Sequence, residues 1–293
     1  ASNNTAVGRN ALGDNTTGYD NVAVGRNALD ANIGGHSNTA LGESSLTSNT
    51  EGDRNVAIGT SALLVNTTGG QNVAIGRGAL DANTTASGNV AVGDLALTTN
   101  TTGSILTAVG TGALASNTTG DYSTAVGLDA LHRQTTGSSN VAIGSRVLED
   151  CTTGVLNTGM GEATLYQLTT GERNCAIGQA GIGITTGSYN VVIGMNAGNN
   201  ITTGANNIFI GNVTAASAVD GAGQIAIGDT VTCVGNDNFT FGAGSLDSNI
   251  AFGATSITAP SDIRLKEDIQ DEEVGLDFIN DLRPVTFLWK KEK

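Results

Sequence analysis

Apolar positions recur along residues 4–230 with a spacing of 17 residues. Each unit reads N-[TV]-A-[VI]-G-x-x-A-L-x-x-N-T-T-G-x-x, and one interval, from Gly178 to Gly194, is 16. A short β-branched segment that ends in glycine and precedes an Asn-Thr-Thr-Gly cluster predicts strands between turns rather than a helix. The sequence therefore predicts fourteen stacked coils. The strand glycines are Gly8, Gly25, Gly42, Gly59, Gly76, Gly93, Gly110, Gly127, Gly144, Gly161, Gly178, Gly194, Gly211 and Gly228.

The predicted fold class is all-β, a parallel β-roll or β-solenoid of 17-residue repeats. Two short strands and two turns account for one unit, so we expect a flattened, two-sided roll. Stacking at a strand spacing of roughly 4.8 Å makes the array about 65 Å long. Equivalent side chains then form columns, with Val7 and Ile58 in one column and Leu12 and Leu63 in another.

Alternation within the predicted strands leaves neither face polar. Val, Ile or Thr stand one and three positions before the glycine, and the residue between them is almost always alanine, as at Ala23, Ala57 and Ala91. Strands that are apolar on both faces are normally covered on both. We therefore expect the Val/Ile face to fill the coil and the Ala face to pack against another chain, most simply in a parallel homotrimer. The alternative origin of the alanines is tight packing within a single coil.

The last 60 or so residues depart from the repeat, which divides the chain into a shaft over residues 1–230, a neck or cap over 231–260 and a distinct segment over 261–293. Pro260 ends the strand pattern. The final segment holds 15 charged residues, and its QDEEVGLDFINDL and VTFLW stretches predict a helix and a strand of a small α/β module. Larger apolar residues mark the neck: Phe239, Phe241 and Phe252.

Composition excludes several classes of protein. A net charge of −14 argues against nucleic-acid binding and against association with anionic membrane surfaces. No apolar run is long enough to span a bilayer, and no export signal is visible at the N-terminus. Aromatic residues make up 4% of the chain, so a conventional core of large side chains is not expected.

Residues with chemical potential are scattered through the shaft, and we predict no cofactor and no metal site. Cys175 replaces the usual Val or Thr of its unit, so we expect a buried structural thiol rather than a ligand or a disulfide partner of Cys151 or Cys233. His36 and His132 stand at variable or turn positions, where an exposed surface histidine is the expected state.

Polar residues of the turns are expected to serve the backbone. The Asn-Thr-Thr clusters match glycosylation sequons, but Asn and Thr side chains also bond turn backbones, which is the preferred interpretation. Regular threonines also suggest an ice-binding surface. The acids Asp14, Asp30, Asp81 and Asp94 show no spacing that demands a glycoside-hydrolysing pair.

The repeat unit resembles the head domains of trimeric autotransporter adhesins, whose units carry an N-x-A-[IV]-G strand in parallel β-rolls that assemble as trimers. It is also similar to the NTA[VI]G-x-x-AL arrays of phage fibre proteins. The resemblance covers residues 4–230, although the period of 17 is longer than the adhesin unit. It implies a homotrimeric surface fibre.

The C-terminal segment opens with SDIRLKEDI and continues with LRPVTFLWK. It resembles the start of the self-cleaving intramolecular chaperone domain of phage tail spikes and fibres, including endosialidases. The resemblance implies that Ser261 is the nucleophile of self-cleavage and Lys266 its general base, and that Asp262 and Arg264 position the loop. Spacing alone equally allows Ser261 to be a helix N-cap and Lys266 a solvated side chain.

These features together predict a viral tail fibre or spike protein for host attachment, exposed on the virion and processed once by its own C-terminal segment. The expected partners are two further copies of the chain and a host cell-surface receptor, either a glycan or a protein. No multi-turnover activity is expected. The alternatives are a bacterial surface adhesin or ice-binding solenoid, and a polysaccharide-depolymerising spike.

Overall fold

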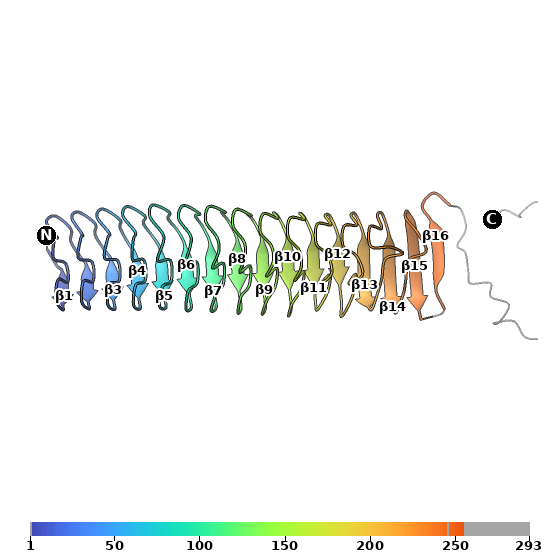
Figure 1. Cartoon of the computed structure of the whole chain (residues 1–293), viewed down its shortest axis with the longest axis horizontal. Helices are drawn as coiled ribbons and strands as arrows, with labels where there is room; N and C mark the ends of the chain where they lie inside the picture. The colour runs from blue at the N-terminus through green and yellow to red at the C-terminus, as the bar shows by residue number, and fades with distance from the viewer. Residues whose placement is uncertain (1, 245, 255–293) are drawn as a thin grey trace, which may run out of the picture. The chain divides into compact units, whose positions relative to one another are not determined.

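The computed structural model describes residues 2–244 and 246–254, which form one β-solenoid (Figure 1). A single sheet runs along it, in which sixteen strands follow one another in chain order. Turns connect the strands, and the described residues contain no helix. The strands are β1 (Thr5–Val7), β2 (Val22–Val24), β3 (Thr39–Leu41), β4 (Val56–Ile58), β5 (Val73–Ile75), β6 (Val90–Val92), β7 (Thr107–Val109), β8 (Thr124–Val126), β9 (Val141–Ile143), β10 (Thr158–Met160), β11 (Cys175–Ile177), β12 (Val191–Ile193), β13 (Ile208–Asn212), β14 (Ile225–Asp229), β15 (Asn238–Ala243) and β16 (Ser248–Ala251).

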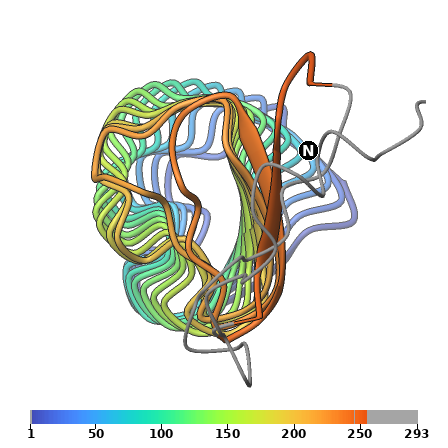
Figure 2. The ribbon, with the colours of Figure 1, turned by 90° about the vertical axis from the view of Figure 1, so that its right-hand side faces the viewer.

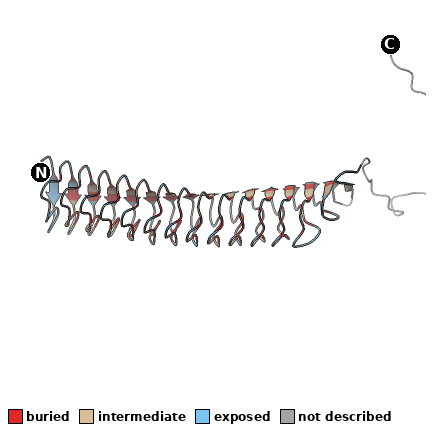
Figure 3. Ribbon diagram, turned by 90° about the horizontal axis from the view of Figure 1, so that it is seen from above, coloured by how far each residue is buried: buried red, intermediate tan, exposed pale blue. Residues whose placement is uncertain are grey.

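The register of the sheet repeats the sequence period. Each strand from β1 to β14 pairs in parallel with the next, so that Ala57 lies beside Ala74 and Ala74 beside Ala91. β15 and β16 pair antiparallel, with Phe239 opposite Ile250. The prediction of an all-β parallel solenoid is confirmed, and the regular stacking ends where the last strand reverses direction. The first coil is the most exposed, since no coil precedes it (Figure 3).

Each coil contains one strand, so the expectation of a two-sided roll with two strands per coil is wrong. Seen end-on, the sheet forms one side of the coil and a curved path closes it (Figure 2). In the curved part alternate residues take the left-handed region, as at Asn27 (φ 57°) and Leu29 (φ 51°). This alternation turns successive amides in different directions. The amide of Asn27 donates to Arg9 O of the preceding coil at 2.9 Å, and that of Leu29 donates to Ser45 O of the following coil at 3.0 Å.

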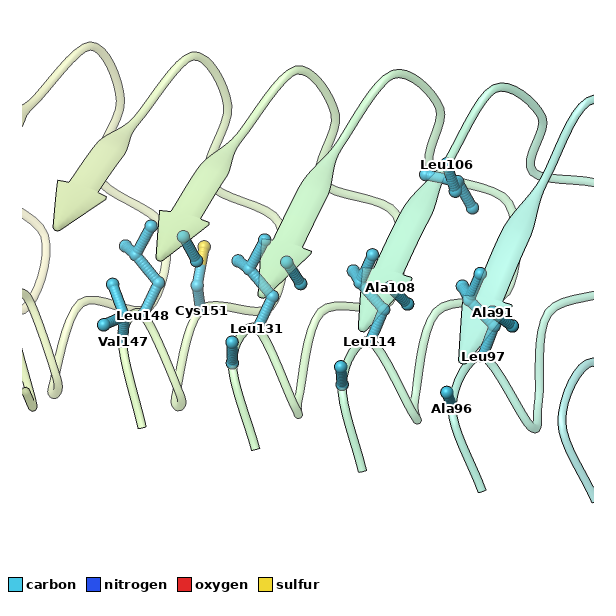
Figure 4. Packing of buried hydrophobic residues seen from close by; sticks show 14 of the residues in the cluster. Ala91, Ala96, Leu97, Leu106, Ala108, Leu114, Leu131, Val147, Leu148 and Cys151 are labelled. Atoms are coloured by element: carbon cyan, nitrogen blue, oxygen red, sulfur yellow. The ribbon is translucent and has the colours of Figure 1, made fainter. Parts of the chain in front are cut away.

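The middle residue of nearly every strand points into the coil and is buried. Ala23, Ala57 and Ala91 have no exposed surface, and the same holds for the leucines of the opposite wall, such as Leu97 and Leu114. Figure 4 shows these leucines repeating from coil to coil. One continuous apolar core therefore runs through the solenoid.

Burial of the alanine column inside a single chain overturns the expectation that it packs against another chain. The Val and Ile residues that were expected to fill the coil point outward instead, and Leu41 is 46% exposed. The alternative interpretation, tight packing within one coil, is correct. The physical reason is limited room, because the opposite wall already supplies an Ala and a Leu in most coils.

Departures from alanine in this column are matched by changes in the facing wall. At Gly159 of β10 an added Cβ would stand 2.6 Å from Cγ1 of Val147, the bulkier residue that replaces the usual alanine of the wall. Conversely, Gly198 stands at the leucine position of the wall, and an added Cβ there would lie 2.9 Å from Val192 and 3.1 Å from Phe209. Large and small residues thus exchange places while the filled volume is conserved.

Two columns of buried asparagines complete the interior. The column before the strands, represented by Asn55, binds its own coil by donating from Nδ2 to Gly69 O at 2.9 Å. The column of the turns, represented by Asn66, donates to the same Gly69 O at 2.9 Å and to Oδ1 of Asn49 in the preceding coil at 2.8 Å. These side chains satisfy backbone groups at the bends that no strand pairing reaches.

Candidate functional site

The residues predicted to carry out self-cleavage, Ser261, Lys266, Asp262 and Arg264, lie outside the described residues. Their roles therefore stay predictions. The structure instead defines the surfaces of the solenoid that lies before them in the chain.

The most distinctive surface is the outward face of the sheet, which we name the outer stripe. It consists of the first and third residues of strands β1–β14, and each of these is Val, Ile, Leu, Met, Thr or Cys. Not one carries a charge. Ten of the apolar members are exposed by 36–58%: Val7, Val22, Leu41, Ile75, Val109, Val126, Ile143, Met160, Ile177 and Ile227.

Charged residues border the outer stripe on the side of the strand glycines. The position after the strand glycine is charged in seven of the fourteen units, among them those of Arg26, Glu43, Arg77 and Asp94. Arg26 forms an ion pair with Glu43 of the next coil, and Arg77 lies 2.8 Å from Asp94. These four charges pair with one another along the solenoid, and none of them belongs to the outer stripe. This surface was not predicted from the sequence. The available signal was the absence of charged residues at the first and third strand positions in all fourteen units.

The Asn-Thr-Thr turns serve the backbone, as predicted. The first threonine of a pair bonds the next coil, as Thr67 Oγ1 does to Thr84 O at 3.1 Å. The second threonine of the pair is exposed. The exposed second threonines of nine successive coils form a column: Thr68, Thr85, Thr102, Thr119, Thr136, Thr153, Thr170, Thr186 and Thr203.

The two histidines are half-buried rather than exposed, and both make contacts between coils. His36 stacks on Tyr19 with ring centroids 4.7 Å apart, and its Nε2 lies 3.2 Å from Asp53. His132 Nδ1 lies 3.1 Å from Gly112 O and 3.3 Å from Asp129 Oδ1. Each histidine thus has a structural partner.

Acidic and metal-ligating groups do not converge on a site. Asp81 accepts from Thr98 Oγ1 at 2.9 Å, and Asp94 pairs with Arg77. Across residues 2–244 and 246–254 no group of three or more His, Cys, Asp or Glu residues is arranged to hold a metal ion. The same residues include no helix that is both long and apolar enough for a membrane span.

The three cysteines are free and differ in their surroundings. Cys151 and Cys233 are buried, and burial raises the pKa of the Cys151 thiol to about 12 and that of Cys233 to about 11. Cys175 opens β11 and faces outward in the outer stripe, where it is half-buried. The expectation that Cys175 is buried is therefore wrong for the single chain.

Tyrosines provide the aromatic surface of the turns. Tyr19, Tyr122 and Tyr189 lie between strands, and all three are exposed. Tyr189 is covered by Arg173, whose guanidinium carbon lies 5.3 Å from the ring centroid. A similar pair, Arg146 over Tyr166 at 4.7 Å, joins different coils and was not anticipated.

Comparison with known proteins gives one match. Residues 261–293 match the family model described as Chaperone of endosialidase. No curated protein and no solved structure matches the chain. In the sequence, the β-solenoid is thus followed from Ser261 onward by a segment that is similar to the endosialidase chaperone family.

Proposed function

We propose that this chain is the shaft of a phage tail fibre or spike, carrying at its C-terminus the beginning of an autoprocessing chaperone. The observation that carries the proposal is the order of the two parts: the last strand of the solenoid ends at Ala251, and the match to the endosialidase chaperone begins ten positions later, at Ser261. A role in host attachment, through a receptor that is a glycan or a protein, and a place on the virion tail complete the proposal.

The physical need for a chaperone comes from the repeat. Coils of 17 residues with near-identical strands can pair in registers shifted by a whole unit, with little local cost. Association of several chains multiplies these errors. A C-terminal segment that brings three chains together first fixes one register from which the shaft assembles.

In the proposed self-cleavage, Ser261 and Lys266 act together as nucleophile and general base. Oγ of Ser261 attacks the carbonyl carbon of an adjacent peptide bond while the amine of Lys266, neutral when desolvation lowers its pKa, accepts the hydroxyl proton. The C–N bond breaks, the proton passes to the leaving amine, and water hydrolyses the resulting ester. Asp262 and Arg264 hold the loop in position. Release of the chaperone after assembly removes the route back to separate chains, which gives kinetic stability.

The test is the mass and the oligomeric state of the full-length protein, beside Ser261→Ala and Lys266→Ala. We expect the wild type to lose a C-terminal piece that begins next to Ser261 and to form a homotrimer, and both variants to remain uncut trimers. A wild type that stays intact, or variants that are cut as efficiently as the wild type, would contradict the assignment of the two residues.

An ice-binding surface is the second candidate. The observation in its favour is the column of exposed threonines from Thr68 to Thr203, which repeats at the coil spacing of roughly 4.8 Å. Thermal hysteresis of the purified protein, abolished by Thr136→Lys, would support this candidate. Release of reducing sugars from a host capsule would instead indicate a depolymerase.

A further inference from the structure

We infer that the outer stripe is the surface through which copies of this chain pack against one another. This inference rests on the proposed assembly of the chain as a multi-chain fibre and names the face that joins its members. It replaces the alanine column, which lies inside the coil, with the Val, Ile and Thr columns of the outward face.

The size of the outer stripe matches that of a stable interface. Fourteen strands at roughly 4.8 Å make it about 65 Å long, and two side chains that are two residues apart make it about 10 Å wide. Each copy thus offers roughly 650 Å², and two copies lose roughly 1,300 Å² of surface, within the range of about 1,200–2,000 Å² for specific interfaces. Apolar patches on single-chain soluble proteins are normally smaller, at about 300–600 Å².

The charge distribution favours a second copy over an unlike partner. The chain has a net charge of −14, yet the outer stripe has no charged member to desolvate when it is covered. The bordering Arg26–Glu43 and Arg77–Asp94 pairs are already neutralised within one chain. An uncharged stripe of constant width along a repetitive rod is complementary to the same stripe on an identical rod.

Bulk increases along the outer stripe toward the C-terminal end. The first and third residues are Thr5 and Val7 in β1, Ile208 and Ile210 in β13, and both are Ile in β14. In β15 the equivalent outward residues are Phe239 and Phe241, whose rings lie 5.0 Å apart. The bulkiest outward residues therefore lie closest in the sequence to the segment that is proposed to assemble first.

Three lysine substitutions on the outer stripe test the inference: Ile75→Lys, Val109→Lys and Ile143→Lys in one full-length chain. Because these side chains point outward, the coil interior is unchanged. The matched control places the same three charges on exposed turn threonines: Thr68→Lys, Thr102→Lys and Thr119→Lys. Light scattering at micromolar concentration measures the mass of each. We expect wild type and control to be oligomers and the stripe variant to fall to the single-chain mass, 29.3 kDa for residues 1–293, with unchanged circular dichroism.

The thiol of Cys175 gives a second measurement, which does not depend on whether the stripe variant folds. Cys175 lies on the outer stripe of β11. We expect the rate at which maleimide labels Cys175 to be at least tenfold lower in the native wild type than in the denatured chain. Both rates are compared at the same fraction of thiolate. Labelling at the same rate in both would overturn the inference.

The possible results separate this inference from the proposed function. An oligomeric wild type whose stripe variant is equally oligomeric overturns the inference and leaves the fibre proposal standing. A wild type at single-chain mass overturns both the inference and the proposed homotrimer. This is also the result expected if the natural partner of the outer stripe is a different protein. Loss of Ser261-dependent cleavage, with the stripe result intact, affects the proposed function alone.

Discussion

The side chain of Asn55 holds the backbone of Asn72, its equivalent in the next coil: Asn55 Oδ1 accepts a hydrogen bond from the Asn72 amide at 3.0 Å. Asn55 in turn receives the same support from Asn38, whose Oδ1 accepts from the Asn55 amide at 2.9 Å. Each of these asparagines also donates to a backbone carbonyl on its own coil, which for Asn55 is Gly69 O and for Asn72 is Ala86 O, both at 2.9 Å. The ladder uses both ends of the side-chain amide, so donor and acceptor are both required.

Replacement of the Asn55 amide by a carboxyl tests this requirement. In Asn55→Asp one oxygen still accepts from Asn72, but the other faces Gly69 O with no proton to donate. Burial without a donor raises the pKa of the new carboxyl, so the variant is most destabilised above that pKa and regains stability as the pH falls and the acid donates to Gly69 O. We expect a loss of about 3 kcal/mol at pH 7, measured by denaturant unfolding.

The matched control is Asn10→Asp. Asn10 is exposed, and its Nδ2 donates to Oδ1 of Asn27 at 3.3 Å, a partner 17 residues away like that of Asn55. A change within about 0.5 kcal/mol is expected there, independent of pH. Equal losses in the two variants would show that burial of the ladder is not the cause.

Strand glycines are required for the close stacking of coils. Gly93 has φ +144°, and an added Cβ would stand 2.4 Å from the backbone oxygen of Gly110. Neither the backbone conformation nor the contact can be relieved locally, so Gly93→Ala should lower the free energy of unfolding by about 3 kcal/mol. In Gly34→Ala the added Cβ meets the flexible side chain of Glu51 instead, and we expect a loss below about 1 kcal/mol. Thermal melting of both variants makes the comparison, and similar melting temperatures would refute it.

Exchange of volume between Gly159 and Val147 predicts a coupled pair of substitutions. Gly159→Ala alone places a methyl group 2.6 Å from Val147 Cγ1 and should cost about 1–3 kcal/mol. Val147→Ala alone leaves a cavity and should cost about 1–2 kcal/mol. The double variant restores the Ala–Ala pair that neighbouring coils use, so its stability should return close to that of the wild type. Additive losses in this double-mutant cycle would mean that the two residues do not compete for the same space.

The buried thiol of Cys151 should make stability depend on pH in the alkaline range. Its pKa rises from 9.0 to about 12 in the folded chain, so above pH 9 the unfolded chain releases this proton while the folded chain retains it. The unfolded state is then favoured, and this contribution lowers stability by about 1.4 kcal/mol per pH unit from pH 9 toward 12. The slope is half its full value at pH 9 and approaches the full value above pH 10, so the difference in unfolding free energy between wild type and Cys151→Ala, under reducing conditions, should shift by about 1.6 kcal/mol between pH 9 and 10.5. A constant difference would contradict the burial.

Much of the fold could be predicted because the repeat is local in origin. The glycine at every seventeenth residue, as at Gly76 and Gly93, fixes where the coils touch, and the Asn-Thr-Thr clusters fix where the chain bends. Neither depends on distant parts of the chain. The C-terminal segment was likewise predicted from a contiguous motif that starts at Ser261, and the family match covers the same residues.

The number of strands per coil could not be predicted in the same way. The segment around Leu29 has the length of a strand, but alternate residues in the left-handed region send its amides to two neighbouring coils without strand pairing. A leucine is not expected in the left-handed backbone region, because its side chain makes no local hydrogen bond that would stabilise this conformation. Its place in the core outweighs that cost in each coil.

The sequence by itself determined the period, the parallel stacking of coils and the apolar character of both faces of each strand. Only the tertiary structure decided that Ala57 lies inside the coil while Val56 and Ile58 face outward. The physical reason is that the interior volume of a coil is shared by all its walls. Residues such as Leu63, far from the strand in the repeat, fill that volume and leave room there for a methyl group and nothing larger.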